Sequence, residues 1–250
     1  MISDFDPIIS CCQDLLNNFP PAQKNKAYID GRLSNEAQET FQFGWFPTNE
    51  HLHILEETVG EELLSKAKTN LVYDKITDGQ RKRHGVLEQH NLVMPYKDVY
   101  GRTIGIVGRS ILNDEARAEI GLPKYKNTSF DKGANLFGFD RARKSIVESG
   151  VVFIVEGQLD CIAAQENGVL NTVALGSSNM TIDQLALVMR YCEKMILLLD
   201  MDEPGRSGAN KIKENYHQHM DIKIAELPSG YHDVDEMGEF IKTWAEKLMT

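Results

Sequence analysis

Two stretches decide the fold: VVFIVEGQLD at residues 151–160 and MILLLDMD at residues 195–202. Each is an uninterrupted apolar run that ends in a carboxylate. Continuous apolar runs of this length are typical of strands buried on both faces of a parallel sheet. We therefore expect Glu156 and Asp200 at the carboxyl ends of two such strands, the edge of an open α/β sheet where ligands bind.

The surrounding sequence extends this pattern. Further apolar runs at residues 172–175 and 222–225 alternate with stretches long enough for crossover helices. An alternation of strands and helices predicts a parallel sheet with helices on its faces. We expect an α/β unit over residues 150–228, with helices at 159–167, 182–191 and 208–217.

The upstream half has a different pattern. Residues 1 to about 70 show apolar residues at helical spacing, and Ser34 is placed to begin one helix. Short apolar stretches at 92–96 and 103–108 predict a hairpin. The polar stretch 75–85 is linker-like and a candidate domain boundary. The expected class is α/β, or α+β overall, with domains at residues 1–149, 150–228 and 229–250.

More carboxylates follow the same strand ends. Asp160 comes four residues after Glu156, Asp202 two residues after Asp200, and the pair Asp233 and Asp235 follows the last predicted strand. Like charges gathered without compensation raise each other's pKa, so such a group indicates bound cations. Oxygen ligands favour Mg²⁺ or Mn²⁺ over zinc. For each pair taken alone, a solvated turn or a charge at a helix N-terminus stays open.

Charge is unevenly distributed along the chain. The net charge of -10 argues against a polyanionic partner, because neutralised phosphates supply most non-specific nucleic-acid affinity. Residues 75–144, however, hold 14 Lys and Arg against 8 Asp and Glu. This basic island predicts a phosphate-binding surface within an otherwise acidic chain.

Other features exclude several classes of protein. Four cysteines without C-x-x-C spacing predict neither a disulfide framework nor a zinc ribbon. Two i, i+2 histidine pairs lack further ligands at metal spacing, and we expect all seven histidines at the surface. No apolar run is long enough to cross a membrane, and the N-terminus is acidic. We therefore expect a cytoplasmic protein.

The acidic motifs carry a family resemblance. E-G-x-x-D followed about 40 residues later by D-x-D-x-x-G resembles the Toprim domain of primases, topoisomerases and nucleases. Ordered segments upstream are similar to the catalytic core of DnaG-type DNA primases, so the resemblance covers roughly residues 27–240. They are residues 28–34, 43–45, 95–109, 123–127, 131–133 and 136–138.

The resemblance implies a Toprim parallel-sheet domain preceded by a mixed primase subdomain. It implies synthesis of short RNA primers on single-stranded DNA from ribonucleoside triphosphates, with two or more Mg²⁺ or Mn²⁺ ions. The implied catalytic residues are Glu156, Asp200 and Asp202. The implied metal ligands are Glu156, Asp160, Asp200, Asp202, Asp233 and Asp235. The implied template or nucleotide contacts are Arg109, Lys124, Asn127 and Lys132, for which a solvated basic face is the alternative.

Some features depart from the family pattern. Gln158 stands where tyrosine is common, Met201 replaces a glycine, and Lys126 interrupts a motif, but each metal ligand is present. The family also carries an N-terminal zinc ribbon and a C-terminal helicase-binding domain. We find neither here, and expect an excised core or a minimal enzyme that works with a replicative helicase or a separate zinc-binding partner.

Two other functions remain open. A Toprim nuclease would use the same carboxylates to cleave phosphodiesters. A non-catalytic replication adaptor would bind DNA equally with or without metal, but the intact carboxylate pairs count against it. A topoisomerase is disfavoured because its chemistry needs a tyrosine in an additional domain.

Overall fold

The computed structural model describes residues 3–66, 69–77, 80–231 and 233–249 of the 250. The chain forms two compact units. The first comprises residues 1–96 and 103–130, and the second comprises residues 97–102 and 131–250.

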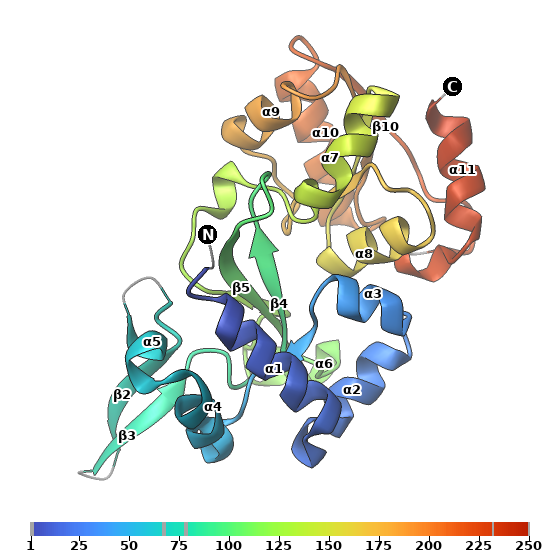
Figure 1. The fold of residues 1–250 in the computed structure, drawn as a ribbon. Coiled ribbons are helices and arrows are strands. Elements are labelled where there is room, and N and C mark those ends of the chain that lie inside the picture. The colour runs from blue at the N-terminus through green and yellow to red at the C-terminus, as the bar shows by residue number, and fades with distance from the viewer. Residues whose placement is uncertain (1–2, 67–68, 78–79, 232, 250) are drawn as a thin grey trace. The chain divides into compact units, whose positions relative to one another are not determined.

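The first unit combines short helices with an antiparallel arrangement of strands (Figure 1). One four-stranded sheet has the order β1-β4-β5-β6, and β2 and β3 form a separate two-stranded ribbon. The helices are α1 (Asp6–Asn18), α2 (Gln23–Asp30), α3 (Asn35–Thr40), α4 (Leu52–Val59), α5 (Glu61–Ser65) and α6 (Asp114–Glu119). The strands are β1 (Gly44–Trp45), β2 (Val72–Thr77), β3 (Gln80–Gly85), β4 (Leu92–Lys97), β5 (Thr103–Arg109) and β6 (Tyr125–Asn127).

Local chemistry explains several of these boundaries. Ser34 begins α3 as predicted, because its hydroxyl accepts a hydrogen bond from the Ala37 amide at 3.1 Å. The helical spacing expected over residues 1 to about 70 is interrupted at Gly60, whose φ of +86° ends α4 and precedes α5. The hairpin of β4 and β5 is confirmed.

One prediction for the first unit is wrong. The polar stretch 75–85 is not a linker between domains, since its described residues pair in the β2–β3 ribbon and lie within one unit. The register aligns Val72 with Gly85 and Thr77 with Gln80.

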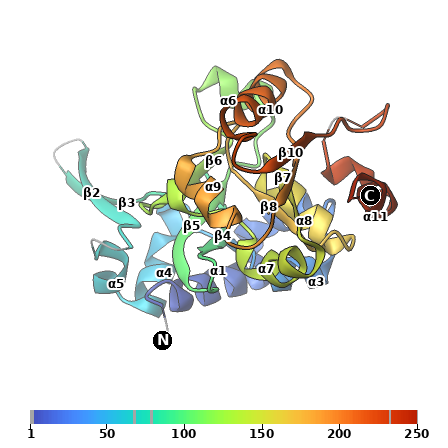
Figure 2. The same ribbon diagram turned by 90° about the horizontal axis from the view of Figure 1, so that it is seen from above.

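The second unit is built on a parallel sheet, as expected. Its strands lie in the order β10-β9-β7-β8, and the three neighbouring pairs run parallel. The strands are β7 (Val151–Val155), β8 (Thr172–Ala174), β9 (Lys194–Leu198) and β10 (Asp221–Ile224). The helices, seen around the sheet in Figure 2, are α7 (Phe139–Ser149), α8 (Gln158–Glu166), α9 (Ile182–Val188), α10 (Glu203–Tyr216) and α11 (Phe240–Met249).

Both faces of this sheet are covered. Every residue of β7 is buried, which explains why the strand shows an unbroken apolar run instead of alternation. Val152 and Ile154 join one core cluster with residues of α7, α9 and α10, while Phe153 points to the opposite face and is also fully buried. Polar side chains next to β7 therefore lie beyond the ends of the strand.

The structure also tests the smaller expectations. All four cysteines are buried free thiols. His90 contradicts the expected surface placement: it is only 2% exposed and its Nε2 lies 2.9 Å from the Pro123 carbonyl oxygen, while His232 lies outside the described residues. Among the described residues, no helix is both long enough and apolar enough to span a bilayer.

Candidate active site

Glu156 and Asp200 leave the parallel sheet at one edge. Strands β7 and β9 are neighbours, with Val155 aligned to Leu198, so the residues that follow them emerge side by side. Glu156 comes directly after β7, and Asp200 comes two residues after β9. The backbone thus has Glu156 and Asp200 at the strand ends that the sequence predicted.

The D-x-D-x-x-G motif has a clear local role. Asp202 is the N-cap of α10, and its Oδ1 accepts a hydrogen bond from the Gly205 amide at 2.8 Å. A Cβ on Gly205 would lie 2.2 Å from the carbonyl oxygen of Asp200. The glycine therefore lets the helix start pack directly against the backbone that carries the first aspartate.

Three of the six predicted metal ligands converge. Asp160 of α8 and the pair Asp233 and Asp235 each offer a carboxylate oxygen, and these oxygens lie within 4.8 Å of one another. Asp235 begins the short 3-10 helix η4 (Asp235–Met237), which contacts α8. The group is thus formed by two segments more than 70 residues apart in sequence.

The electrostatics of this group fit a bound cation. Burial, the hydrogen bond with Asp235, and the charges of Asp235, Asp160 and Glu236 raise the pKa of Asp233 to about 8. Its Oδ1 is buried and accepts no hydrogen bond from a described residue. Close, partly buried carboxylate oxygens are the ligands that Mg²⁺ and Mn²⁺ prefer, and a divalent ion would offset their repulsion.

Glu156, Asp200 and Asp202 are not members of that group among the described residues. Asp200 lines a separate cavity of about 120 Å³ together with Arg206, Asn210 and Glu226. Glu226 was missed by sequence reasoning. Its position just after the last apolar strand could have identified it, because that is the rule that identified Glu156 and Asp200.

Lys132 lies at the same sheet edge as Glu156. It begins the 3-10 helix η3 (Lys132–Ala134), and its Nζ donates to the carbonyl oxygen of Gly176 at 2.5 Å. The Gly176 amide in turn donates to the carbonyl oxygen of Glu156 at 2.8 Å. Burial lowers the pKa of Lys132. Within the second unit, an amine from the predicted basic set thus reaches the loop whose backbone is hydrogen-bonded to the backbone of Glu156.

The other three predicted contacts belong to the first unit. Arg109 is only 7% exposed, and its guanidinium donates to the hydroxyls of Tyr28 (2.6 Å) and Tyr125 (2.5 Å). Its charge also lies over both rings, at 5.5 and 5.0 Å from their centroids. Arg109 is therefore held in place by two tyrosines that lie within the segments 28–34 and 123–127 but were not predicted as site residues.

Lys124 directly precedes the short strand β6, and Asn127 is its last residue. Lys124 is exposed. Asn127 is half-buried, and its side-chain Oδ1 has no hydrogen-bond partner among the described residues. A buried amide oxygen of this kind is available to a ligand that donates hydrogen bonds.

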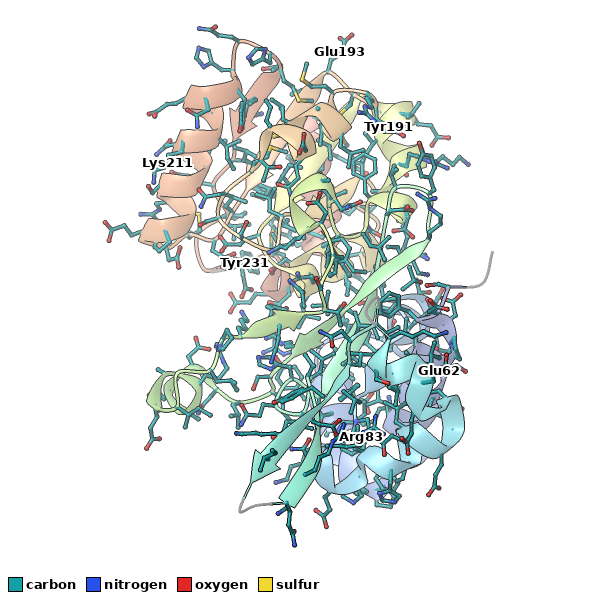
Figure 3. All side chains as sticks on the ribbon, turned by 90° about the vertical axis from the view of Figure 1, so that its left-hand side faces the viewer. Glu62, Arg83, Tyr191, Glu193, Lys211 and Tyr231 are labelled. Atoms are coloured by element: carbon teal, nitrogen blue, oxygen red, sulfur yellow. The ribbon has the colours of Figure 1, made fainter. Side chains whose placement is uncertain are left out.

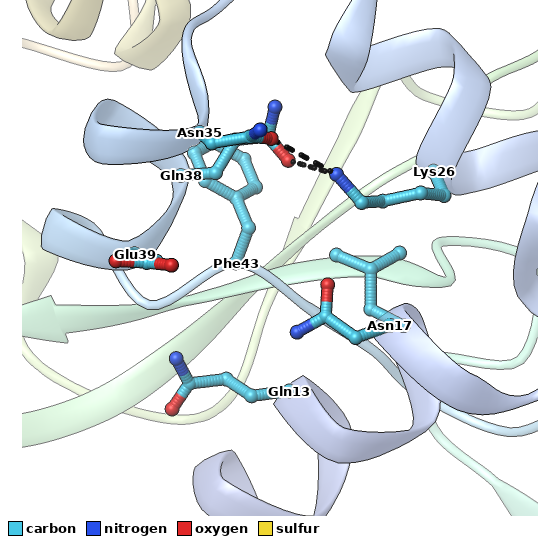
Figure 4. A pocket seen from close by; sticks show the side chains of 8 residues that line it. Gln13, Asn17, Lys26, Asn35, Gln38, Glu39 and Phe43 are labelled. Carbon is cyan, nitrogen blue, oxygen red and sulfur yellow. Dashed lines mark hydrogen bonds between the residues drawn. The ribbon is translucent and has the colours of Figure 1, made fainter.

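A larger pocket in the first unit does not fit a phosphate. It has a volume of about 310 Å³ and lies between α1, α2 and α3 (Figure 4). Lys26 is the cation that lines it, but Lys26 pairs with Asp30 and donates to Gln38 Oε1 at 3.0 Å. Because its charge and hydrogen bonds are already matched within the protein, we do not assign this pocket to the site.

Comparison with known proteins adds to this geometry. The family model described as the DNA primase catalytic core, N-terminal domain, matches residues 13–143, which is more than half of the chain. The chain belongs to the DNA primase catalytic core family. A second model, described as Toprim-like, matches residues 153–238 of this primase core and so includes each of the six carboxylates.

Individual relatives agree with this assignment. The primase core is 30% identical to a DNA primase of Synechocystis sp., over 91% of this chain and 36% of that protein. It is 29% identical to a DNA primase of Aquifex aeolicus, over 89% of this chain and 44% of that protein. The chain therefore spans less than half the length of these two curated relatives.

Solved structures show the same fold. The E. coli primase catalytic core matches with a TM-score of 0.77 and 25% identity, over 98% of this chain and 79% of that one. A DnaG primase catalytic domain bound to single-stranded DNA matches with a TM-score of 0.75 and 25% identity, over 98% and 79%. The mixed fold with a parallel Toprim-like sheet is thus that of a DnaG catalytic core.

Proposed function

We propose that this primase core synthesises short RNA primers on single-stranded DNA by metal-dependent nucleotidyl transfer. The observation that carries the proposal is the convergence of Asp160, Asp233 and Asp235 in a chain of the primase family. A structural relative bound to single-stranded DNA supports the choice of template.

We assign two sets of carboxylates to divalent cations. Asp160, Asp233 and Asp235 would hold one ion, and Asp200 with Asp202 would bind a second near the incoming triphosphate. Such ions supply charge neutralisation for the triphosphate and the departing pyrophosphate. Mg²⁺ and Mn²⁺ both suit these oxygen ligands.

The protein's own groups position the reactants. In the transfer, the 3′ oxygen of the growing primer bonds to the α-phosphorus, and the bond from that phosphorus to pyrophosphate breaks. Glu156, at the end of β7, is assigned to receive the proton of the 3′ hydroxyl or to ligate an ion beside it. The Lys132 ammonium, which donates to the Gly176 carbonyl oxygen at 2.5 Å, is assigned to contact a phosphate oxygen at this edge.

Arg109, Lys124 and Asn127 are assigned to the template or nucleotide. Lys124 offers an exposed charge, and Asn127 offers a buried side-chain oxygen that can accept a hydrogen bond from the ligand. Because Arg109 is enclosed by Tyr28 and Tyr125, its part is to present those two hydroxyls in a fixed position.

A template-directed synthesis assay tests the function. The chain is incubated with single-stranded DNA of varied sequence, labelled ATP, the other ribonucleotides and Mg²⁺. We expect short RNA products that disappear on chelation, and their loss in Asp200→Ala and Asp202→Ala variants that remain folded. Cleavage of labelled DNA by the wild-type chain without nucleotides would instead identify a nuclease. Near-normal synthesis by either folded variant would refute the assignment of this carboxylate pair.

A further inference from the structure

The β2–β3 ribbon carries a set of side chains that the proposed active site does not use. In its register Tyr73 is opposite His84 and Lys75 is opposite Lys82. Residues two apart along a strand point to the same side, so these four side chains share one face of the ribbon. We refer to Tyr73, Lys75, Lys82 and His84 as the ribbon face.

The two lysines oppose each other directly. Both are exposed, and neither forms an ion pair with a described residue. Like charges directly opposite in an antiparallel pair destabilise it. A partner that supplies negative charge beside these two lysines would therefore stabilise the ribbon.

The opposite face of the ribbon is neutralised within the protein. Arg81 pairs with Asp74, and Arg83 pairs with Glu56 at 3.0 Å and Glu61 at 2.6 Å. Figure 3 shows Arg83 on the ribbon next to the helical segment that carries Glu62. Positive charge without a described counter-ion is therefore confined to one side of the ribbon.

The ribbon face also offers an aromatic surface. The rings of Tyr73 and His84 stack at 5.7 Å with an interplanar angle of 24°, and Tyr73 is 49% exposed. The imidazole ring of His84 is held in place by Asn49, because its Nδ1 lies 2.8 Å from the Asn49 side-chain nitrogen. The exposed tyrosine ring is thus supported by a ring that is itself held in place.

We propose that the ribbon face is a contact surface for the single-stranded DNA template, with Lys75 and Lys82 on phosphates and Tyr73 stacked on a base. Surfaces that bind single strands without sequence preference combine cations with exposed aromatic rings. An acidic protein partner would account for the lysines but not for the stacked, half-exposed ring. The inference rests on the proposed function, since that function supplies the template.

Binding of a labelled mixed-sequence oligonucleotide, measured by fluorescence anisotropy over a range of salt concentrations, tests the lysines. The Lys75→Thr, Lys82→Thr double variant should bind more weakly. The slope of log affinity against log salt should become shallower by about 1.4, at about 0.7 per phosphate contact on a single strand. Thermal stability should stay equal or rise, because like-charge repulsion is removed and threonine favours strands.

The charge-matched control is Lys211→Gln with Lys213→Gln on α10, which removes the same two charges. Figure 3 shows Lys211 pointing away from the helix, and both lysines are exposed. This control should keep the wild-type salt slope. An equal loss in both double variants, or a wild-type slope in the ribbon variant, overturns the proposal.

Tyr73 provides an independent readout. Tyr73→Ala should weaken single-strand binding about tenfold with an unchanged salt slope, whereas Tyr73→Phe should retain it. Photocrosslinking of a halogenated oligonucleotide to the wild-type chain should label residues 73–84. Label confined to other segments contradicts the proposal even if a variant fails to fold.

These measurements separate the two proposals. Binding requires no synthesis. If the wild-type chain makes no primer, and the Lys75→Thr, Lys82→Thr variant still binds single strands more weakly than the wild type, only the proposed function is refuted. If the wild-type chain makes primers, and the ribbon variant binds single-stranded DNA as tightly as the wild type, only the ribbon contact is refuted.

Discussion

Asp233 illustrates the electrostatic cost of the carboxylate group. Burial, followed by the hydrogen bond and charge of Asp235 and the charges of Asp160 and Glu236, raises its pKa to about 8. An unfolded aspartate titrates near a pH of about 3.9. The folded chain therefore holds this proton more tightly than the unfolded chain between these two pH values. Without divalent ions, the stability that the protonated form provides is complete below pH about 4 and is lost as pH rises to about 8.

This sign gives a testable pH dependence. In a chelating buffer, the Tm of the wild-type chain should fall more steeply between pH 5 and pH 8.5 than that of Asp233→Asn, which keeps no titratable proton there. Added Mg²⁺ should raise the wild-type Tm most at the alkaline end. Parallel pH profiles for the two proteins would contradict the placement of Asp233.

Gly205 tests the packing of the second carboxylate pair. A Cβ there would meet the Asp200 carbonyl oxygen at 2.2 Å, and that backbone atom has no freedom to move aside cheaply. Gly205→Ala should therefore cost about 1–3 kcal/mol in the free energy of unfolding.

The matched control for Gly205 is Gly31→Ala. A Cβ on Gly31 would lie 3.6 Å or more from the nearest atoms, and the φ of Gly31 is -75°, so the change should be neutral or slightly stabilising. Denaturant unfolding measures both variants. Equal effects would mean that the close approach at Gly205 is not what requires glycine.

At the scale of elements, sequence patterns identified the buried strands and missed the exposed ribbon. Strands β7 and β9 are covered on both faces and show unbroken apolar runs, which is why the parallel sheet could be predicted. The β2–β3 ribbon exposes most of its side chains and has no apolar face, so period-two alternation is absent. Its pairing depends on anchoring by Arg83 and Asn49, which no local pattern encodes.

Helix α9 offers a prediction at this scale. Thr181 and Gln184 form a capping box, and the Thr181 hydroxyl also donates to the Gly133 carbonyl oxygen next to Lys132. Thr181→Ala should cost about 1 kcal/mol of unfolding free energy, while Thr181→Ser should restore most of it. Hydrogen exchange should become faster at residues 132–135 in the alanine variant only. An unaltered exchange rate there would show that the cap acts on α9 alone.

For the whole molecule, the charge pattern and the motifs predicted the family more accurately than they predicted the geometry of the site. The family models match both halves of the chain, and Glu156 and Asp200 follow the ends of two neighbouring parallel strands. Which of them converge could not be predicted, because Asp233 and Asp235 reach Asp160 through a segment without periodic pattern. The path of that segment depends on tertiary packing of η4 against α8.

The central claim is that Asp160, Asp233 and Asp235 together hold a divalent cation. Mn²⁺ binding followed by electron paramagnetic resonance measures this directly. Asp235→Asn should lose one Mn²⁺ site per chain or bind that ion about tenfold more weakly. Asp221→Asn, an exposed change at the opposite, amino-terminal end of β10, should bind as the wild type does. Equal Mn²⁺ binding by the wild-type chain and Asp235→Asn would contradict the account.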